Sequence, residues 1–174
     1  MKKFLIVLTT IIVVLLMLLI QKNVLEKIPL FGICPNIGTV LVCAIAVVSG
    51  AYVGGAIGFF YGLALDVAYG RMVGMNLLAY LIIGIICGLL NYKISKDSKI
   101  SLAVFVFAST ILLELITAFF MVLFYKVDIS LTHLLKIISI ESIYNLFLSF
   151  VFYHSLTALG EQINRTKKSY YVLN

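Results

Sequence analysis

Six apolar segments make up most of this 174-residue chain and constrain its fold more than any other feature. Several approach the ~20 residues that an α-helix needs to cross the hydrocarbon core of a bilayer. Lipid offers no partners for backbone N–H and C=O groups, so such segments are expected to be membrane helices. The segments are about residues 4–20, 34–49, 51–66, 73–90, 102–125 and 137–158.

The composition is that of an integral membrane protein. Hydrophobic residues make up 63% of the chain and charged residues 11%, with a mean hydropathy of +1.18. Charged residues approach a quarter of an ordinary soluble domain, so that class is excluded. We predict an all-α integral membrane fold: a single six-transmembrane-helix bundle at 1–160, followed by a short basic cytoplasmic tail at 161–174.

The distribution of basic residues predicts the orientation of the chain in its membrane. Lysine and arginine gather at the chain ends and in the loop at 91–100, and this excess marks cytoplasmic segments. With six spans both termini share a side, so both are predicted to be cytoplasmic. No contiguous basic face is evident, which argues for contacts with anionic membrane lipids and against nucleic acid.

The second and third segments are joined almost without a loop around residues 49–51. Both are shorter than the spanning length. They are interpreted either as two short helices or as one broken, re-entrant element. The second form requires that the surrounding protein satisfies its backbone groups.

Glycine recurs at every fourth position of the third segment. The positions are Gly50, Gly54, Gly58 and Gly62, and Asp66 takes the next step. Glycine costs roughly 0.5–1 kcal/mol relative to alanine in a helix in water, so helix propensity does not explain four in register. Small residues at this spacing let membrane helices approach closely. We therefore expect this segment to be the central packing helix, with the stripe serving helix packing and partner binding.

Asp66 is placed where the glycine-rich helix reaches the outer interface, with Gly70 and Gly74 around the following turn. Its carboxylate is expected to accept hydrogen bonds from the backbone of that turn and to pair with Arg71. Two roles are open for Asp66: a structural cap on the reversal, or a fixed turn against which a partner docks.

Two carboxyl groups lie inside later apolar segments. Glu114 is 12 residues into the fifth segment, about 18 Å along a helix axis and near the bilayer midplane. A charge there costs about 2.5–3.5 kcal/mol on insertion scales, so a partner is expected, with Asn145 or Ser149 at similar depth. The group either joins two helices or binds a partner or ligand. Glu141, one turn inside the sixth segment, is expected to form an interfacial ion pair with Lys136 or Lys126.

No pattern of residues typical of catalysis or metal binding is evident. His133 and His154 lack a second ligand at metal-binding spacing, and the three cysteines are isolated. The sequence contains no Ser-His-Asp set, no phosphate loop and no aspartate cluster. We therefore expect a non-enzymatic protein without catalytic residues, cofactor or metal.

The order of motifs along the whole chain resembles the MreD family of rod shape-determining membrane proteins. The motifs are Pro35-Asn36, the glycine-rich run Gly50–Asp66, Gly70, Gly74-x-Asn76, the helix with Gly84 and Gly88, and Asn145 in the last span. The most specific portion is Gly54-x3-Gly58-x3-Gly62-Leu63-x2-Asp66.

The resemblance implies a scaffold of the bacterial cell-elongation machinery. Members of this family pair with MreC, a protein with a single span and a coiled coil. Through it they link the actin-like MreB to RodA and its class B penicillin-binding transpeptidase, which build peptidoglycan. The fold is implied to be similar to the six-helix substrate-binding subunits of energy-coupling-factor transporters.

A small-molecule-binding subunit of such a transporter is the alternative. It requires a polar pocket near the outer face, which residues 66, 71, 76 and 141 could line. It also requires an alanine-rich docking face on the first helix. That helix is bulky throughout residues 11–20, which favours the scaffold.

Overall fold

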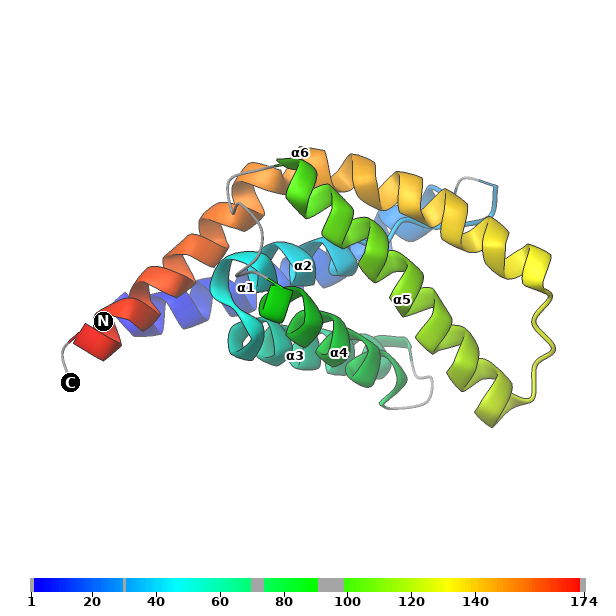
Figure 1. Ribbon diagram of the computed structural model, residues 1–174, viewed down its shortest axis with the longest axis horizontal. Coiled ribbons are helices and arrows are strands. Elements are labelled where there is room, and N and C mark those ends of the chain that lie inside the picture. The colour runs from blue at the N-terminus through cyan, green and yellow to red at the C-terminus, as the bar shows by residue number, and fades with distance from the viewer. Residues whose placement is uncertain (1, 30, 70–73, 91–98, 173–174) are drawn as a thin grey trace.

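The computed structural model describes residues 2–29, 31–69, 74–90 and 99–172, and the regular elements in this part of the chain are helices, without strands (Figure 1). The all-α prediction is therefore confirmed. The six apolar segments correspond to six α-helices, with a short 3-10 helix after the first. The elements are α1 (Lys2–Asn23), η1 (Leu25–Lys27), α2 (Ile37–Ser49), α3 (Ala51–Tyr69), α4 (Met75–Leu90), α5 (Lys99–Tyr125) and α6 (Leu131–Val172).

Four of these helices are long and apolar enough to cross a membrane, and the other two are shorter. The long ones are α1, α3, α5 and α6, whereas α2 and α4 have 13 and 16 residues. At 1.5 Å per residue α2 is about 20 Å long, less than a hydrocarbon core of about 30 Å. The length of α2 therefore suits a helix held inside the protein.

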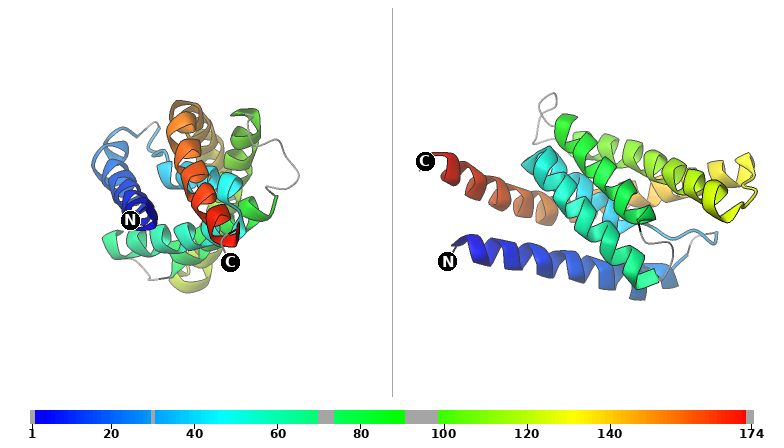
Figure 2. Two further views of the ribbon diagram at one scale, coloured as in Figure 1. Left: turned by 90° about the vertical axis from the view of Figure 1, so that its left-hand side faces the viewer. Right: turned by 90° about the horizontal axis from the view of Figure 1, so that it is seen from below.

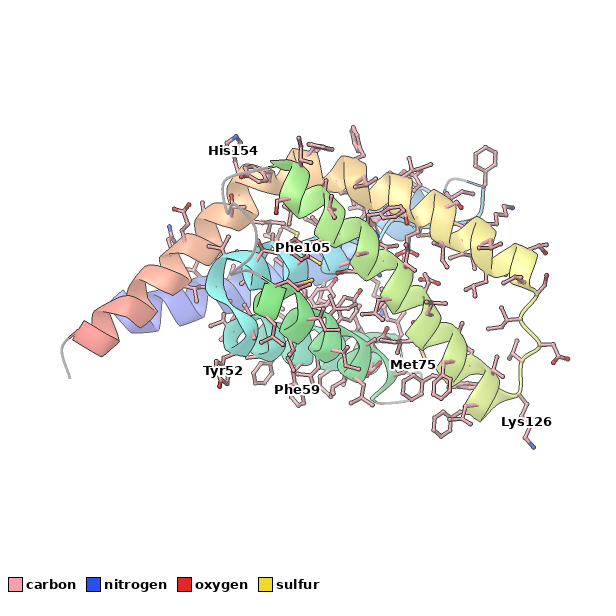
Figure 3. All side chains as sticks on the ribbon, in the orientation of Figure 1. Tyr52, Phe59, Met75, Phe105, Lys126 and His154 are labelled. Atoms are coloured by element: carbon pink, nitrogen blue, oxygen red, sulfur yellow. The ribbon has the colours of Figure 1, made fainter. Side chains whose placement is uncertain are left out.

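Helix α2 occupies the centre of the bundle. All 13 of its residues are buried, and it contacts α1, α3, α4, α5 and α6. A helix that is apolar on every side lies either in a protein core or in lipid, and the contacts of α2 place it in the core. The expectation that the glycine-rich segment forms the central helix is therefore wrong. That segment, α3, has an exposed face, and Figure 3 shows Tyr52, 88% exposed, pointing away from the bundle.

Helices α2, α3 and α4 form two consecutive antiparallel pairs. A single residue, Gly50, separates α2 from α3, with φ of 88°. Glycine adopts this left-handed backbone readily, which permits the abrupt reversal. Residues at equal or nearly equal distances from Gly50 along the chain meet, since Gly54 lies against Ala46 and Gly38 against the Tyr61 ring. The short apolar runs are thus two separate helices.

The last two helices form a hairpin that opens toward its connection. Helices α5 and α6 contact one another, yet their ribbons diverge toward residues 126–130 (Figure 1). No residue from 114 through 140 is buried. Figure 3 shows Lys126, at the end of α5, pointing away from the bundle. We call residues 114–140 the open hairpin.

The start of α1 and the end of α6 lie at the same end of the molecule (Figure 2). This arrangement fits an even number of passes. Helix α6 extends to Val172. Residues 161–172, which were expected to belong to a separate tail, therefore continue this helix.

Candidate functional site

The glycine stripe forms a tight contact between α3 and α4. A Cβ atom at Gly58 would clash with the backbone carbonyl of Tyr80, and one at Gly62 with the backbone of Asn76 and Leu77. On the opposite helix, a Cβ at Gly84 would meet the backbone of Gly54. Backbone against backbone is the packing that small residues permit in membranes. We call this contact the α3–α4 seam.

Gly50 and Gly74, which also belong to the predicted set, have left-handed backbone conformations. Gly50 ends α2 with φ of 88°, and Gly74 has φ of 113° in the turn before α4; glycine adopts such conformations readily. A Cβ at Gly50 itself would meet nothing within 4 Å, but a Cβ at Gly88 of α4 would meet the Gly50 carbonyl carbon at 2.5 Å. Gly50 therefore lies at one end of the seam, opposite Gly88. Gly70 lies outside the described residues.

Asp66 caps α4 from the end of α3. The side chain is fully buried, and its two oxygens accept hydrogen bonds from the backbone N–H groups of Gly74 (2.8 Å), Asn76 (3.1 Å) and Leu77 (3.1 Å). The Asn76 side-chain amide donates a fourth, at 2.9 Å. These N–H groups have no partners within the helix, and a carboxylate at this end also faces the positive end of the helix dipole. The hydrogen bonds expected from the following turn are present, while Arg71 lies outside the described residues.

The start of α2 is held by hydrogen bonds with the Asn36 side chain, which precedes the helix, and with side chains of three other helices. The Asn36 side chain accepts from the Thr39 N–H at 3.4 Å, a common helix-capping arrangement. Gln21 of α1 accepts from the Ile37 N–H at 3.0 Å, and Asn145 of α6 accepts from the Asn36 N–H at 2.7 Å. Tyr80 of α4 donates to Asn36 at 2.7 Å. Distant parts of the sequence thus converge on the Pro35-Asn36 motif.

The partner expected for Glu114 differs from the one observed. Asn145 donates to Thr110 (3.0 Å) and to Glu141 (3.3 Å), and Ser149 donates to the carbonyl of Leu146 within its own helix. The half-buried carboxyl of Glu114 instead lies close enough to that of Glu141 to interact with it. Glu141 and Asn145 are four residues apart and share a face of α6, which brings both toward α5.

The interfacial ion pair expected for Glu141 is also wrong. Its side chain is only 5% exposed, whereas Lys126 and Lys136 are exposed. Glu141 adjoins the side chains of Asn145 and Asn36. The error came from taking a position one turn inside the apolar segment as the membrane surface. Helix α6 begins at Leu131, ten residues before Glu141.

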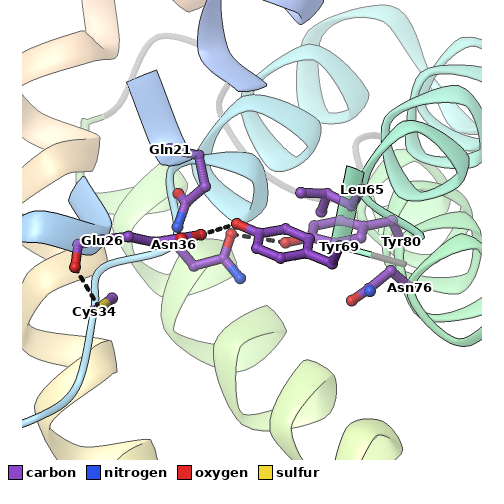
Figure 4. A pocket seen from close by; sticks show the side chains of 8 residues that line it. All are labelled: Gln21, Glu26, Cys34, Asn36, Leu65, Tyr69, Asn76 and Tyr80. Atoms are coloured by element: carbon purple, nitrogen blue, oxygen red, sulfur yellow. Dashed lines mark hydrogen bonds between the residues drawn. The ribbon is translucent and has the colours of Figure 1, made fainter. Parts of the chain in front are cut away.

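A polar pocket of about 420 Å³ opens beside these caps (Figure 4). It lies where α1 and α3 end and α2 and α4 begin. Its lining residues are Gln21, Glu26, Cys34, Asn36, Leu65, Tyr69, Asn76 and Tyr80. Of the residues considered for an outer pocket, Asn76 lines it. Asp66 and Glu141 are not among the lining residues, and Arg71 lies outside the described residues.

Sequence reasoning missed Gln21, Glu26, Tyr69 and Tyr80 as pocket residues. Gln21 follows directly after the first apolar run, and Tyr80 lies inside the fourth, so neither is marked by the pattern of the sequence. The signal that pointed here was Pro35-Asn36, because asparagine before an apolar run predicts a helix start whose N–H groups need partners. That signal fixes the position of the cap without identifying which distant side chains supply it.

The three cysteines are free. Cys43 and Cys87 are buried with their sulfur atoms 3.6 Å apart, and each lies 3.2 Å from Ser109 Oγ. Cys34 is half-buried and borders the pocket. Within the described residues, no group of three or more His, Cys, Asp or Glu side chains is arranged to hold a metal ion.

A comparison with protein families gives a match over most of the chain. The family model described as rod shape-determining protein MreD matches residues 1–162. No curated protein and no solved structure is similar enough to this chain to be matched with it.

Proposed function

Since the chain belongs to the MreD family of rod shape-determining proteins, we propose that it is a non-enzymatic membrane scaffold of the cell-elongation machinery. In this role it binds an MreC-like protein with a single span and a coiled coil. That complex couples MreB to RodA and a class B penicillin-binding transpeptidase. The match over residues 1–162 is the observation that carries the proposal.

We further propose that the bundle sits in the plasma membrane with both termini in the cytoplasm. The basic residues near both ends support this orientation, and so does the shared position of the two ends (Figure 2). Similarity to the substrate-binding subunits of energy-coupling-factor transporters belongs to the same proposal.

The partner's span is proposed to pack on the open hairpin. The α3–α4 seam is already filled from both sides, so a second protein cannot use it without separating the two helices. The open hairpin has no buried residue and exposes apolar side chains on both arms, among them Phe119 and Leu131. Helix faces of this kind support packing against another membrane helix.

Native mass spectrometry of the tagged chain, extracted gently from its own membranes, tests the scaffold role. We expect a single-span coiled-coil protein to travel with the chain in stoichiometric amount. An unrelated tagged multi-pass protein is the control and should travel alone. If the chain also travels alone, the proposal is contradicted.

Two matched tryptophan substitutions test the surface. Leu131 on α6 and Val67 on α3 are each 70% exposed. We expect Leu131→Trp to reduce partner recovery and Val67→Trp to leave it unchanged. Equal recovery with both variants would place the partner elsewhere.

A small-molecule-binding transporter subunit is the second candidate, and the polar pocket is the observation that favours it. Its volume lies within the range of small-ligand sites, about 300–1,000 Å³. An ATPase module in place of the coiled-coil protein, together with a bound metabolite, would support this candidate in the same experiment.

A further inference from the structure

The pocket beside Asn36 has a lining that is acidic and rich in hydrogen-bond acceptors. Glu26 is its carboxylate, and no lysine or arginine is among the described residues that line it. Glu141 lies just behind, in contact with the Asn36 side chain. Lys22 is nearby, but its ammonium group donates to the Ala68 carbonyl at 2.8 Å. Among the described residues, the lining therefore holds one carboxylate, Glu26, and no cationic side chain.

Two helix N-termini point toward the pocket, and both are already satisfied. Helix N-termini usually attract anions through free N–H groups. Here the N–H groups of Asn36 and Ile37 donate to Asn145 and Gln21, and those at the start of α4 donate to Asp66. An anion would have to displace these acceptors and approach Glu26. The arrangement therefore disfavours anionic ligands.

The remaining groups suit a cation with N–H donors. The Glu26 carboxylate accepts from the Tyr69 hydroxyl and retains further acceptor positions. Asn76 uses its amide nitrogen toward Asp66, which leaves the amide oxygen as an acceptor. Tyr69 and Tyr80 supply aromatic rings, and the Lys22 ammonium lies 5.7 Å from the centroid of the Tyr69 ring. Cations are attracted to the faces of such rings.

We propose that this pocket binds a primary ammonium or guanidinium group. Two sources share this chemistry: a lysine or arginine side chain of a partner polypeptide, and a free small amine. Binding through a partner's side chain rests on the proposed scaffold function, whereas binding of a free amine does not.

Cys34 provides a direct reporter of occupancy, because its half-buried thiol borders the pocket while Cys43 and Cys87 are buried. The rate of alkylation by N-ethylmaleimide is measured on the purified chain in lipid nanodiscs, with Cys34→Ser giving the background. The probes are N-acetyl-lysine amide and N-acetyl-arginine amide, with the matched glutamine and glutamate compounds as controls. A basic probe at about four times its Kd should slow alkylation fivefold.

The carboxylate requirement is tested by Glu26→Gln, which keeps the shape of the side chain. We expect this variant to lose the protection by basic probes. Asp128→Asn removes an exposed carboxylate from the 126–130 connection, and this variant should keep the protection by basic probes. Tyr69→Phe, which removes the hydroxyl bonded to Glu26, should weaken protection. Equal protection by the glutamine or glutamate compound, or none by either basic compound, would overturn the proposal.

Partner recovery separates the two sources. If Glu26→Gln loses both protection and partner recovery, the cation belongs to the partner. If protection is lost while recovery stays normal, the ligand is a free amine. If the unaltered chain recovers its partner but no basic probe protects Cys34, the pocket proposal fails and the scaffold function stands.

Discussion

At the scale of single residues, Asp66 shows how one side chain organises a turn. A helix start normally takes its cap from the residue just before it, but α4 takes its cap from the end of the preceding helix. Four hydrogen bonds converge on the two oxygens of one fully buried carboxylate. The cap ties the end of α3 to the start of α4 at one end of the seam.

We predict that Asp66→Ala lowers the free energy of unfolding by about 3 kcal/mol, because buried N–H groups lose a charged acceptor. Asp66→Asn keeps one acceptor oxygen and should cost roughly half as much. Thermal unfolding in detergent measures both. Asp128→Asn, in the exposed connection, serves as the control and should unfold like the unaltered chain. An unchanged unfolding temperature in Asp66→Ala would contradict the capping role.

The sequence predicts a residue's role best when its partners are close along the chain. Asp66 and its turn lie within 11 residues of one another, and the expected backbone hydrogen bonds are present. Asn145 and Asn36 are 109 residues apart, so nothing local identifies their contact. For Glu114, depth in the helix indicated the need for a partner but not that another carboxyl, Glu141, would be its neighbour.

At the scale of elements, the α3–α4 seam has a regular register. Gly54 faces Gly84, Gly58 faces Tyr80 and Gly62 faces Asn76, so each step of four along α3 matches a step of four along α4. Antiparallel helices in close contact keep such a register only if small residues repeat on the shared face. The glycine period predicted close packing, but the identity of the facing helix required the structure.

We predict that Gly58→Ala destabilises the bundle by about 1–3 kcal/mol, because the added methyl group forces two backbones apart. Alanine's higher helix propensity, about 1 kcal/mol, offsets part of this cost. Gly55→Ala is the matched control on the same helix, since its Cβ would meet a side chain, with Ile85 Cγ1 at 2.9 Å, and no backbone atom. Unfolding temperatures in detergent should fall for Gly58→Ala and change much less for Gly55→Ala. A larger loss at Gly55 would contradict the proposed seam.

At the scale of the whole molecule, hydropathy predicted the helices but not their arrangement. The predicted segments overlap all six observed helices. In a soluble protein an apolar face indicates the core, whereas in a membrane protein lipid and core accept the same side chains. For this reason the uniformly apolar α2 gave no sign that it is central, and the glycine-rich α3 was taken for the central helix.

Labelling of Cys34 tests the orientation of the whole molecule. Burial, reinforced by the nearby Glu26 carboxylate, raises the pKa of the Cys34 thiol above its ordinary value. The thiolate is the reactive form, so labelling should be slow at neutral pH and should accelerate as the pH rises beyond about 8.5. With cytoplasmic termini, a membrane-impermeant maleimide should label Cys34 in intact cells. Labelling only after permeabilisation would reverse the orientation, and Cys34→Ser gives the background.

The buried position of α2 also has a consequence for how the protein is made. Its 13 residues, about 20 Å of helix, leave the ribosome long before α5 and α6, which later cover it. Until then α2 remains beside α3, to which the one-residue reversal at Gly50 connects it. It lies either in the translocon or in a bilayer whose hydrocarbon core is thicker than the helix is long. Chains truncated before α6 should therefore remain substrates for membrane quality-control proteases. The first half of this protein therefore completes its folding only after the last helix has been inserted.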